Sequence, residues 1–218
     1  MDRRWQDCGV AEDWTAVIPI KPLDGAKTRL RGAVPDGRLA DLALAMARDT
    51  VAAVLACPAV CEVLVVTDDP VAARAAAALG ARVVPDRPGA GLNAALRFGA
   101  DVVAGMSRPR AALAGDLPAL RPEELAAALT LARRRSFVAD AEGSGTVLLG
   151  APPGVALDPR FGVGSAAAHT VSGARALAGD WPGLRHDVDT AADLQTVLEL
   201  GAGRYTRAMF AEICDRRR

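Results

Sequence analysis

The alternation between short apolar runs and longer segments with helical spacing most constrains how this chain can fold. The run Glu62–Thr67 is continuously apolar after the initial glutamate, as expected of a strand buried on both faces. In the preceding segment, 36–56, apolar residues recur on one face of a helix. Because the alternation continues along the chain, it predicts a mostly parallel, doubly wound sheet with right-handed crossovers. The 218 residues are expected to form one α/β domain.

The expected elements follow one another along the whole chain. Strands are expected at 16–20, 62–67, 82–84, 111–114, 136–139, 146–149 and 184–187. Helices are expected at 36–56, 71–79, 91–104, from 122, and at 166–178, 193–200 and 203–218. The first residues are polar and contain no apolar core of a secretory signal. We therefore expect residues 1–14 to form an N-terminal extension and residues 15–218 to form the domain.

Composition argues against several classes of protein. The formal net charge is zero, so the chain offers no bulk field for nucleic acid or an anionic membrane. Its apolar runs are shorter than the 18 or so residues of a membrane span. The four cysteines (Cys8, Cys57, Cys61 and Cys214) lack the spacing of a zinc site or a disulfide framework. Reduced thiols and a cytoplasmic location are expected.

A cationic loop follows the first expected strand. It contains Lys21, Lys27 and Arg29, and its two lysines are the only lysines among 26 basic residues. In a sequence that otherwise uses arginine, a retained lysine indicates a need for a compact point charge. Cations at the carboxyl end of a first strand are typical of a phosphate site in an α/β protein. The alternative is an ordinary solvated turn.

Acidic residues occur at two other places where strands are expected to end. Asp116 follows Gly115, which allows close approach to the backbone. Asp187 and Asp189 flank Val188, and a period of two places both carboxylates on one face. Three carboxylates beside a phosphate-binding loop predict a Mg²⁺ site, because Mg²⁺ binds few carboxylates together with water and substrate phosphate.

The acidic pair and the single asparagine each admit a structural alternative. Asp189 is also placed to cap the following helix, where Thr190 and Asp193 form a capping pattern. Asn93 is the only asparagine of the chain, and its amide suits recognition of a nucleobase or ribose. A polar contact at the start of a helix is the alternative for Asn93.

Two glycine-containing segments end at a hydroxyl residue. They are Gly143–Thr146 and Phe161–Ser165, and the second opens an expected helix. Both are typical of anion-binding turns, although either could be only a turn. His169 is interpreted as a surface residue or as a residue behind the site. No P-loop motif is present, and no dinucleotide-binding glycine motif follows the first expected strand.

Taken in order, these segments resemble one known family, the phosphoenolpyruvate and 2-phospholactate guanylyltransferases of deazaflavin coenzyme biosynthesis. The likeness covers about residues 15–205, and the bacterial, phosphoenolpyruvate-using branch is the most similar. The matching segments are Pro22–Leu30, Val65–Asp68, Gly91–Leu96, Gly115–Leu120, Ser136–Asp140, Gly145–Thr146, Pro159–Gly162, Trp181–Arg185 and Asp187–Thr190.

The resemblance implies a nucleotidyltransferase fold of the glycosyltransferase-A-like kind, with GTP as co-substrate, Mg²⁺ as cofactor and pyrophosphate as product. It also implies that the deazaflavin–riboflavin transferase acts downstream. The metal ligands would be Asp116, Asp187 and Asp189. The residues that bind phosphoenolpyruvate would be Thr146, Gly162 and Ser165.

The remaining expected roles follow from the same arrangement. Lys21, Lys27 and Arg29 would draw charge from the departing pyrophosphate, and the GTP-binding set would be Thr67, Asn93 and Gly115. Two alternatives stay open: 2-phospholactate as the acceptor, and a non-catalytic nucleotide-binding protein. Transfer to a molybdopterin is disfavoured because the first loop has no Gly-Gly step. A nucleotide-sugar glycosyltransferase is disfavoured because the region expected to bind the acceptor is small and suited to an anion rather than a sugar.

Overall fold

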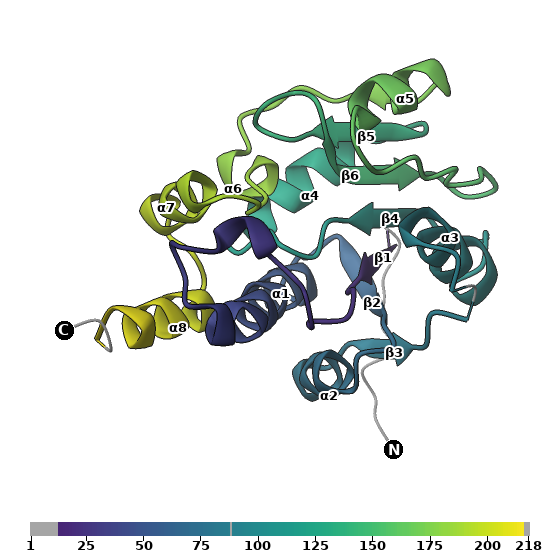
Figure 1. The fold of residues 1–218 in the computed structure, drawn as a ribbon. Coiled ribbons are helices and arrows are strands. Elements are labelled where there is room, and N and C mark those ends of the chain that lie inside the picture. The colour runs from purple at the N-terminus through teal and green to yellow at the C-terminus, as the bar shows by residue number, and fades with distance from the viewer. Residues whose placement is uncertain (1–12, 88, 216–218) are drawn as a thin grey trace.

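The computed structural model describes residues 13–87 and 89–215, in which one mixed sheet of seven strands is covered by helices (Figure 1). The sheet order is β3-β2-β1-β4-β6-β5-β7. The strands are β1 (Trp14–Pro19), β2 (Val60–Val66), β3 (Arg82–Val84), β4 (Arg110–Leu113), β5 (Ser136–Ala139), β6 (Thr146–Ala151) and β7 (Arg175–Ala176). Only β6 runs antiparallel to its neighbours, β4 and β5; the other pairings are parallel. The expected mostly parallel α/β sheet is therefore confirmed, with β6 as an exception that the sequence analysis did not anticipate.

Helices pack on both faces of this sheet. They are α1 (Leu39–Leu55), α2 (Pro70–Leu79), α3 (Leu92–Arg97), α4 (Pro122–Leu131), α5 (Ser165–Val171), α6 (Pro182–Arg185), α7 (Ala191–Leu200) and α8 (Arg204–Asp215). One apolar core joins α1, α2 and α4 to one face, and a second joins α3 and α5 to the other (Figure 1). A third core joins α1, α7 and α8. Among the described residues, no helix is both long and apolar enough to span a bilayer.

Most of the expected elements are present, but three boundaries differ. The helix expected at 166–178 ends at Val171, because Arg175 and Ala176 add a short strand beside β5. The helix expected at 91–104 consists of α3 followed by a π-helical segment, Phe98–Val103. Trp14 was expected to belong to the extension. It is instead the first residue of β1, and its side chain is buried. Residues 1–12 of that expected extension lie outside the described residues.

The prediction of a strand at 184–187 is wrong. The chain there forms the single helical turn α6, with Pro182 at its first position. The carboxylate of Glu124 accepts hydrogen bonds from the backbone N–H groups of Gly183 (3.3 Å) and Leu184 (2.8 Å). These contacts supply acceptors for amides that a helix start leaves unpaired. Asp187 and Asp189 therefore follow a helical turn rather than a strand.

The sheet order creates a topological switch point between β1 and β4. The chain passes from β1 to β2 and β3 on one side, then returns to form β4 on the other side of β1. The loops that leave β1 and β4 consequently diverge, and ligands of open α/β sheets bind at such a point. Lys27 lies in the first of these loops and Asp116 in the second.

The attachment of α8 depends on a buried carboxylate of α1. Asp49 accepts hydrogen bonds from the backbone N–H groups of Tyr205 (3.1 Å) and Thr206 (2.7 Å) at the start of α8. We expect Asp49→Ala to lower the free energy of unfolding by about 1–3 kcal/mol, because two buried donors lose their acceptor. Urea unfolding measures this. Asp41→Ala is the matched control, since Asp41 lies on the same helix in a partly exposed pair with Arg38. Losses of equal size would contradict this role for Asp49.

Candidate active site

The cationic loop after β1 is anchored by the start of α2. Asp69 accepts a hydrogen bond from the backbone N–H of Leu23 (2.9 Å). The same carboxylate caps α2 by accepting from Val71 (2.8 Å) and Ala72 (2.9 Å). The hydrogen bond from Leu23, aided by those from the helix amides, holds the pKa of Asp69 below its ordinary value. Asp69 thereby fixes where the loop leaves the sheet.

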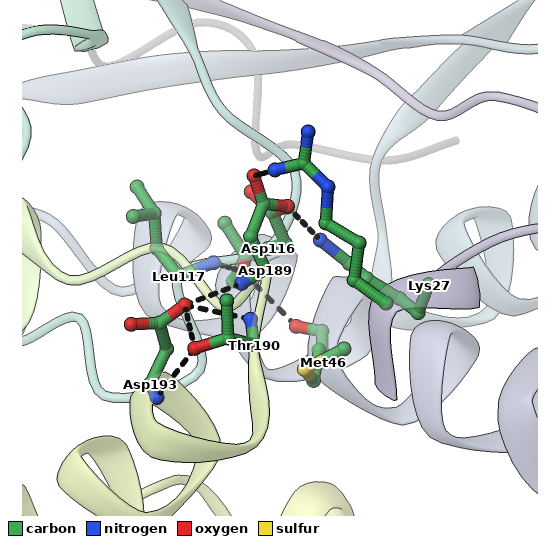
Figure 2. A network of polar contacts seen from close by, with 9 residues as sticks. Lys27, Met46, Asp116, Leu117, Asp189, Thr190 and Asp193 are labelled. Atoms are coloured by element: carbon green, nitrogen blue, oxygen red, sulfur yellow. Dashed lines mark hydrogen bonds and ion pairs between the residues drawn. The ribbon is translucent and has the colours of Figure 1, made fainter. Parts of the chain in front are cut away.

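Lys27 reaches from this loop to two of the three expected metal carboxylates (Figure 2). Its ammonium contacts Asp116 and lies 3.2 Å from Oδ1 of Asp189. Arg29 adds a longer pair, 3.6 Å from its Nη1 to Oδ2 of Asp189. Burial lowers the pKa of Lys27, but the charges of Asp116 and Asp189 outweigh it and raise the pKa above its ordinary value. The structure therefore brings these four predicted residues together.

Asp187 lies beside this cluster. Burial is the main cause that raises the pKa of its carboxyl to about 7, and the negative charges of Asp116, Asp189 and Asp140 add to it. The backbone N–H of Val188 donates to the Asp116 carbonyl (3.2 Å), which fixes segment 187–189 beside the turn after β4. The three aspartates therefore share one electrostatic environment.

The capping alternative for Asp189 is wrong. Thr190 is the N-cap of α7, and its hydroxyl accepts from the Asp193 backbone (3.3 Å). The Asp193 carboxylate in turn accepts from the Thr190 backbone (2.7 Å), which completes a capping box. With these roles filled, the Asp189 carboxylate faces Lys27 (Figure 2).

The residues expected to hold the acceptor meet at the amino end of β6. Thr146 begins β6, and Ser165 begins α5. The two segments are joined by a hydrogen bond from the Ala166 N–H to the Ser144 carbonyl (3.1 Å). The Ser165 N–H donates to the carbonyl of Gly162, whose φ of 134° favours glycine. The three predicted residues, Thr146, Gly162 and Ser165, therefore lie in one region.

Asp140, which sequence reasoning did not single out, shapes the turn before Thr146. Its carboxylate accepts from the backbone N–H groups of Ser144 (2.9 Å) and Gly145 (2.7 Å). An aspartate that opens a Gly-Ser-Gly turn is a recognisable signal for this arrangement. Arg185, which lies two residues before Asp187, donates from its guanidinium to the Asp140 carbonyl (2.8 Å). This contact connects the acceptor turn to the carboxylate cluster.

The turn after β4 and the start of β6 also meet through backbone pairing. The Ala114 N–H donates to the Val147 carbonyl (2.9 Å). The turn that contains Asp116 therefore starts beside the first residues of β6, which include Thr146. Because β6 is antiparallel to β4, its start lies at the edge where β4 ends. The acceptor residues thus reach the same edge as the carboxylates.

His169 is completely buried behind the acceptor turn. Its Nδ1 lies 3.0 Å from the Thr146 hydroxyl, and its Nε2 accepts from the Arg160 N–H (2.9 Å). The ring packs against Phe137 and edge-on against Phe161. Burial lowers the pKa of His169 to about 4, so the ring is neutral at pH 7. Of the two interpretations of His169, the surface position is wrong.

The residues expected to bind GTP are more widely placed. Thr67 lies at the end of β2, and its hydroxyl accepts from the Asp69 N–H (3.1 Å). At Gly115 an added Cβ would lie 3.0 Å from the Pro19 carbonyl oxygen, so the turn after β4 packs closely on the chain leaving β1. The amide of Asn93 forms a reciprocal pair with the Phe161 backbone, 2.9 Å from Nδ2 to the carbonyl and 2.7 Å from the N–H to Oδ1. Lys21 is exposed.

The donor set fits a hard divalent cation in its chemistry. Across residues 13–87 and 89–215, no group of three acidic, histidine or cysteine side chains is already arranged around a common point. The Lys27 ammonium occupies the position between Asp116 and Asp189, so a cation is already bound by these oxygens. Burial, followed by the negative charges of Asp116 and Asp189, raises the pKa of Asp187, and a bound cation would offset these effects. Asp116, Asp187 and Asp189 are the residues that could hold Mg²⁺.

Known proteins share both the sequence and the fold. The family model described as "Guanylyl transferase CofC like" matches residues 14–214. The phosphoenolpyruvate guanylyltransferase of Salinispora arenicola is 61% identical over 88% of this chain and 91% of its own. The protein of that name from Geodermatophilus obscurus is 54% identical over 90% of this chain and 93% of its own. A nucleotidyl transferase from Methanothermobacter thermautotroptrophicus shares the fold, with a TM-score of 0.62 at 19% identity over 87% of this chain and 98% of its own.

These likenesses extend over nearly the whole described sheet and its helices, and they confirm the family that the motifs predicted. The chain belongs to the CofC-like guanylyltransferase family.

Proposed function

We propose that this protein transfers GMP from GTP to phosphoenolpyruvate and releases pyrophosphate. The product would be enolpyruvoyl-2-diphospho-5'-guanosine, an intermediate of deazaflavin coenzyme biosynthesis. The observation that carries the proposal is the meeting of a cationic loop, three aspartates and a hydroxyl-bearing turn at one sheet edge. The name of the relatives in Salinispora and Geodermatophilus supports phosphoenolpyruvate as the acceptor.

The reaction requires two anions to approach each other. An oxygen of the phosphoenolpyruvate phosphate attacks the α-phosphorus of GTP in line. The bond from that phosphorus to the bridging oxygen breaks, and its electrons leave with pyrophosphate. The nucleophile is already an anion, so no strong general base is needed. Mg²⁺ bound by Asp116, Asp187 and Asp189 would supply positive charge at the α-phosphate and bring the reactants together.

The protein's own cations act on the leaving group. Lys27 and Arg29 lie beside the carboxylates, and Lys21 is in the same loop. We assign these three residues to the β- and γ-phosphates, where they stabilise the charge that develops on pyrophosphate. For Lys27 this requires the ammonium to leave its present place between Asp116 and Asp189.

The remaining residues bind the two substrates. Thr146, Ser165 and the backbone at Gly162 would seat the carboxylate and phosphate of the acceptor. The nucleotide would lie against the ends of β2 and β4, at Thr67 and Gly115. Asn93, whose amide is engaged by the Phe161 backbone, would hold the segment before Gly162 instead of reading the base directly. The buried thiol of Cys57, which is not in a disulfide, is compatible with a cytoplasmic protein.

A product assay tests the proposed function directly. Purified protein, GTP and Mg²⁺ are incubated with phosphoenolpyruvate or 2-phospholactate, with the deazaflavin–riboflavin transferase present to trap product for mass spectrometry. We expect product from phosphoenolpyruvate, and Asp116→Asn to lower turnover by about 100-fold or more, as loss of a key electrostatic group does. Product from 2-phospholactate alone would change the acceptor. If neither acceptor gives product while GTP still binds, the result would favour a non-catalytic nucleotide-binding protein.

Lys27 should compete with a divalent metal for the same oxygens. Replacement by methionine keeps the length of the side chain and removes the ammonium, so Lys27→Met should bind Mn²⁺ more tightly, by about tenfold. Electron paramagnetic resonance of free Mn²⁺ measures this without turnover. The control is Lys21→Met, which removes an exposed lysine from the same loop and should leave Mn²⁺ affinity unchanged. Equal or weaker Mn²⁺ binding by Lys27→Met would contradict the competition.

Asp187 should lower the stability of the metal-free protein at neutral and basic pH. Its pKa is about 7 in the folded chain, against about 3.9 when unfolded, so stability falls as pH rises through this interval. We expect Asp187→Asn to raise the free energy of unfolding by about 1–3 kcal/mol at pH 8. At pH 4 the carboxyl is protonated and the gain should vanish. Urea unfolding in EDTA measures both values, and an equal effect at the two pH values would refute the explanation.

A further inference from the structure

We infer that His169 is a positioning residue for the acceptor site. Its imidazole holds the Thr146 hydroxyl as a hydrogen-bond donor toward the substrate, and it fixes the backbone that leads to Gly162. This inference rests on the proposed function, because the ligand that Thr146 and Gly162 would receive is the anionic acceptor. His169 itself lies behind the site and does not touch the substrate.

The tautomer of His169 follows from its backbone partner. The Arg160 N–H can only donate, so Nε2, 2.9 Å away, must be the acceptor. In a neutral ring the hydrogen then resides on Nδ1. Nδ1 lies 3.0 Å from the Thr146 hydroxyl, and the ring also has a hydrogen bond to the Ser165 backbone, which favours a protonated ring nitrogen. Nδ1 therefore donates, and the Thr146 oxygen accepts.

This direction determines what Thr146 can offer a ligand. A hydroxyl has one hydrogen and can accept at its oxygen lone pairs. Because the Thr146 oxygen accepts from His169, its own hydrogen remains available for another acceptor. A carboxylate or phosphate oxygen is an acceptor and carries no hydrogen to donate. The opposite tautomer would draw the threonine hydrogen toward the ring and present lone pairs to the anion.

The surroundings of His169 keep the ring neutral and fixed. It is fully buried, and the aromatic rings of Phe137 and Phe161 lie 5.7 Å and 5.3 Å from it between centroids. The charges of Asp158, Arg135 and Arg160 also act on it, but burial dominates and lowers its pKa to about 4. A single tautomer is therefore present across the range in which the enzyme would work.

A second side chain fixes the same segment from the other side. Asn93, on α3, pairs with both the N–H and the carbonyl of Phe161. His169 holds the preceding N–H, that of Arg160. Two consecutive residues before Gly162 are thus held by side chains from separate helices. The backbone at Gly162 is in this way presented in a defined position.

The first experiment reads the tautomer in the unmodified protein. Nitrogen-15 NMR at pH 7 distinguishes a protonated Nδ1 from a protonated Nε2, and His186→Gln assigns the signals because the chain has two histidines. We expect His169 to carry its hydrogen on Nδ1. A hydrogen on Nε2, or a doubly protonated ring, would overturn the inference.

The second experiment separates the two contacts by substitution. His169→Asn keeps a donor near the place of Nδ1, whereas His169→Gln keeps an acceptor near the place of Nε2. We expect His169→Gln to raise the KM for phosphoenolpyruvate by roughly tenfold, as loss of one hydrogen bond to a charged group does, with the KM for GTP unchanged. In a Thr146→Val background, His169→Gln should have no further effect on the KM for phosphoenolpyruvate.

The same measurements define a purely structural role. Equal increases in both KM values with a lower melting temperature, or an effect of His169→Gln that persists in Thr146→Val, would overturn the inference. If a variant does not fold, the NMR result on the unmodified protein decides. Failure of this inference is distinct from failure of the proposed function, because the latter requires that the wild-type protein itself form no product from phosphoenolpyruvate.

Discussion

The crowding of three carboxylates at one sheet edge is the constraint on which the site depends. Burial is the main cause that raises the pKa of Asp187, and the like charges of Asp116 and Asp189 add to it. Lys27 offsets the repulsion between Asp116 and Asp189, and to do so its backbone adopts a left-handed conformation with a φ of 55°. Such a conformation costs free energy in a residue other than glycine, so it persists only where contacts compensate for it. The ion pairs of Lys27 supply such contacts.

The antiparallel strand β6 explains how one sheet binds two substrates. The carboxyl ends of β1, β2 and β4 share an edge because these strands are parallel. A further parallel strand beside β4 would bring another strand-to-helix loop to this edge. The reversed β6 brings its first residue, Thr146, there instead, together with the turn shaped by Asp140. The residues proposed to bind the acceptor consequently lie at the same sheet edge as the carboxylates.

The sequence predicts those parts of the site that depend on which residues directly follow a strand. Lys27 and Asp116 could be paired in advance because each follows a strand of the same sheet, and such strand ends share an edge. The turn at α6 could not be foreseen, because its amides are capped by Glu124, almost 60 residues earlier in the chain. The Glu124 carboxylate lies in the first turn of its own helix, α4. Its partner is set by packing, which periodicity does not encode.

The contacts of Asn93 and His169 illustrate the same limit. The rarity of asparagine indicated a specific role for Asn93, but its partner, the Phe161 backbone, lies 68 residues away. A histidine on a short helix gives no signal that both its nitrogens are engaged, and this became visible only with the fold. Composition drew attention to Asn93 but not to the two contacts of His169, and for both residues the tertiary structure determined what the side chain binds.

The link from Asn93 to Phe161 has a consequence for catalysis. In-line attack requires the acceptor oxygen and the α-phosphorus to be held within a few tenths of an ångström, and small displacements lower the rate steeply. Asn93 belongs to α3, which packs on the nucleotide half of the sheet, and Phe161 belongs to the segment before the acceptor glycine. In the proposed reaction, a direct pair between them would help to set the distance between the two substrates. Such pre-organisation matters most where, as here, the reactants repel each other and would separate in water.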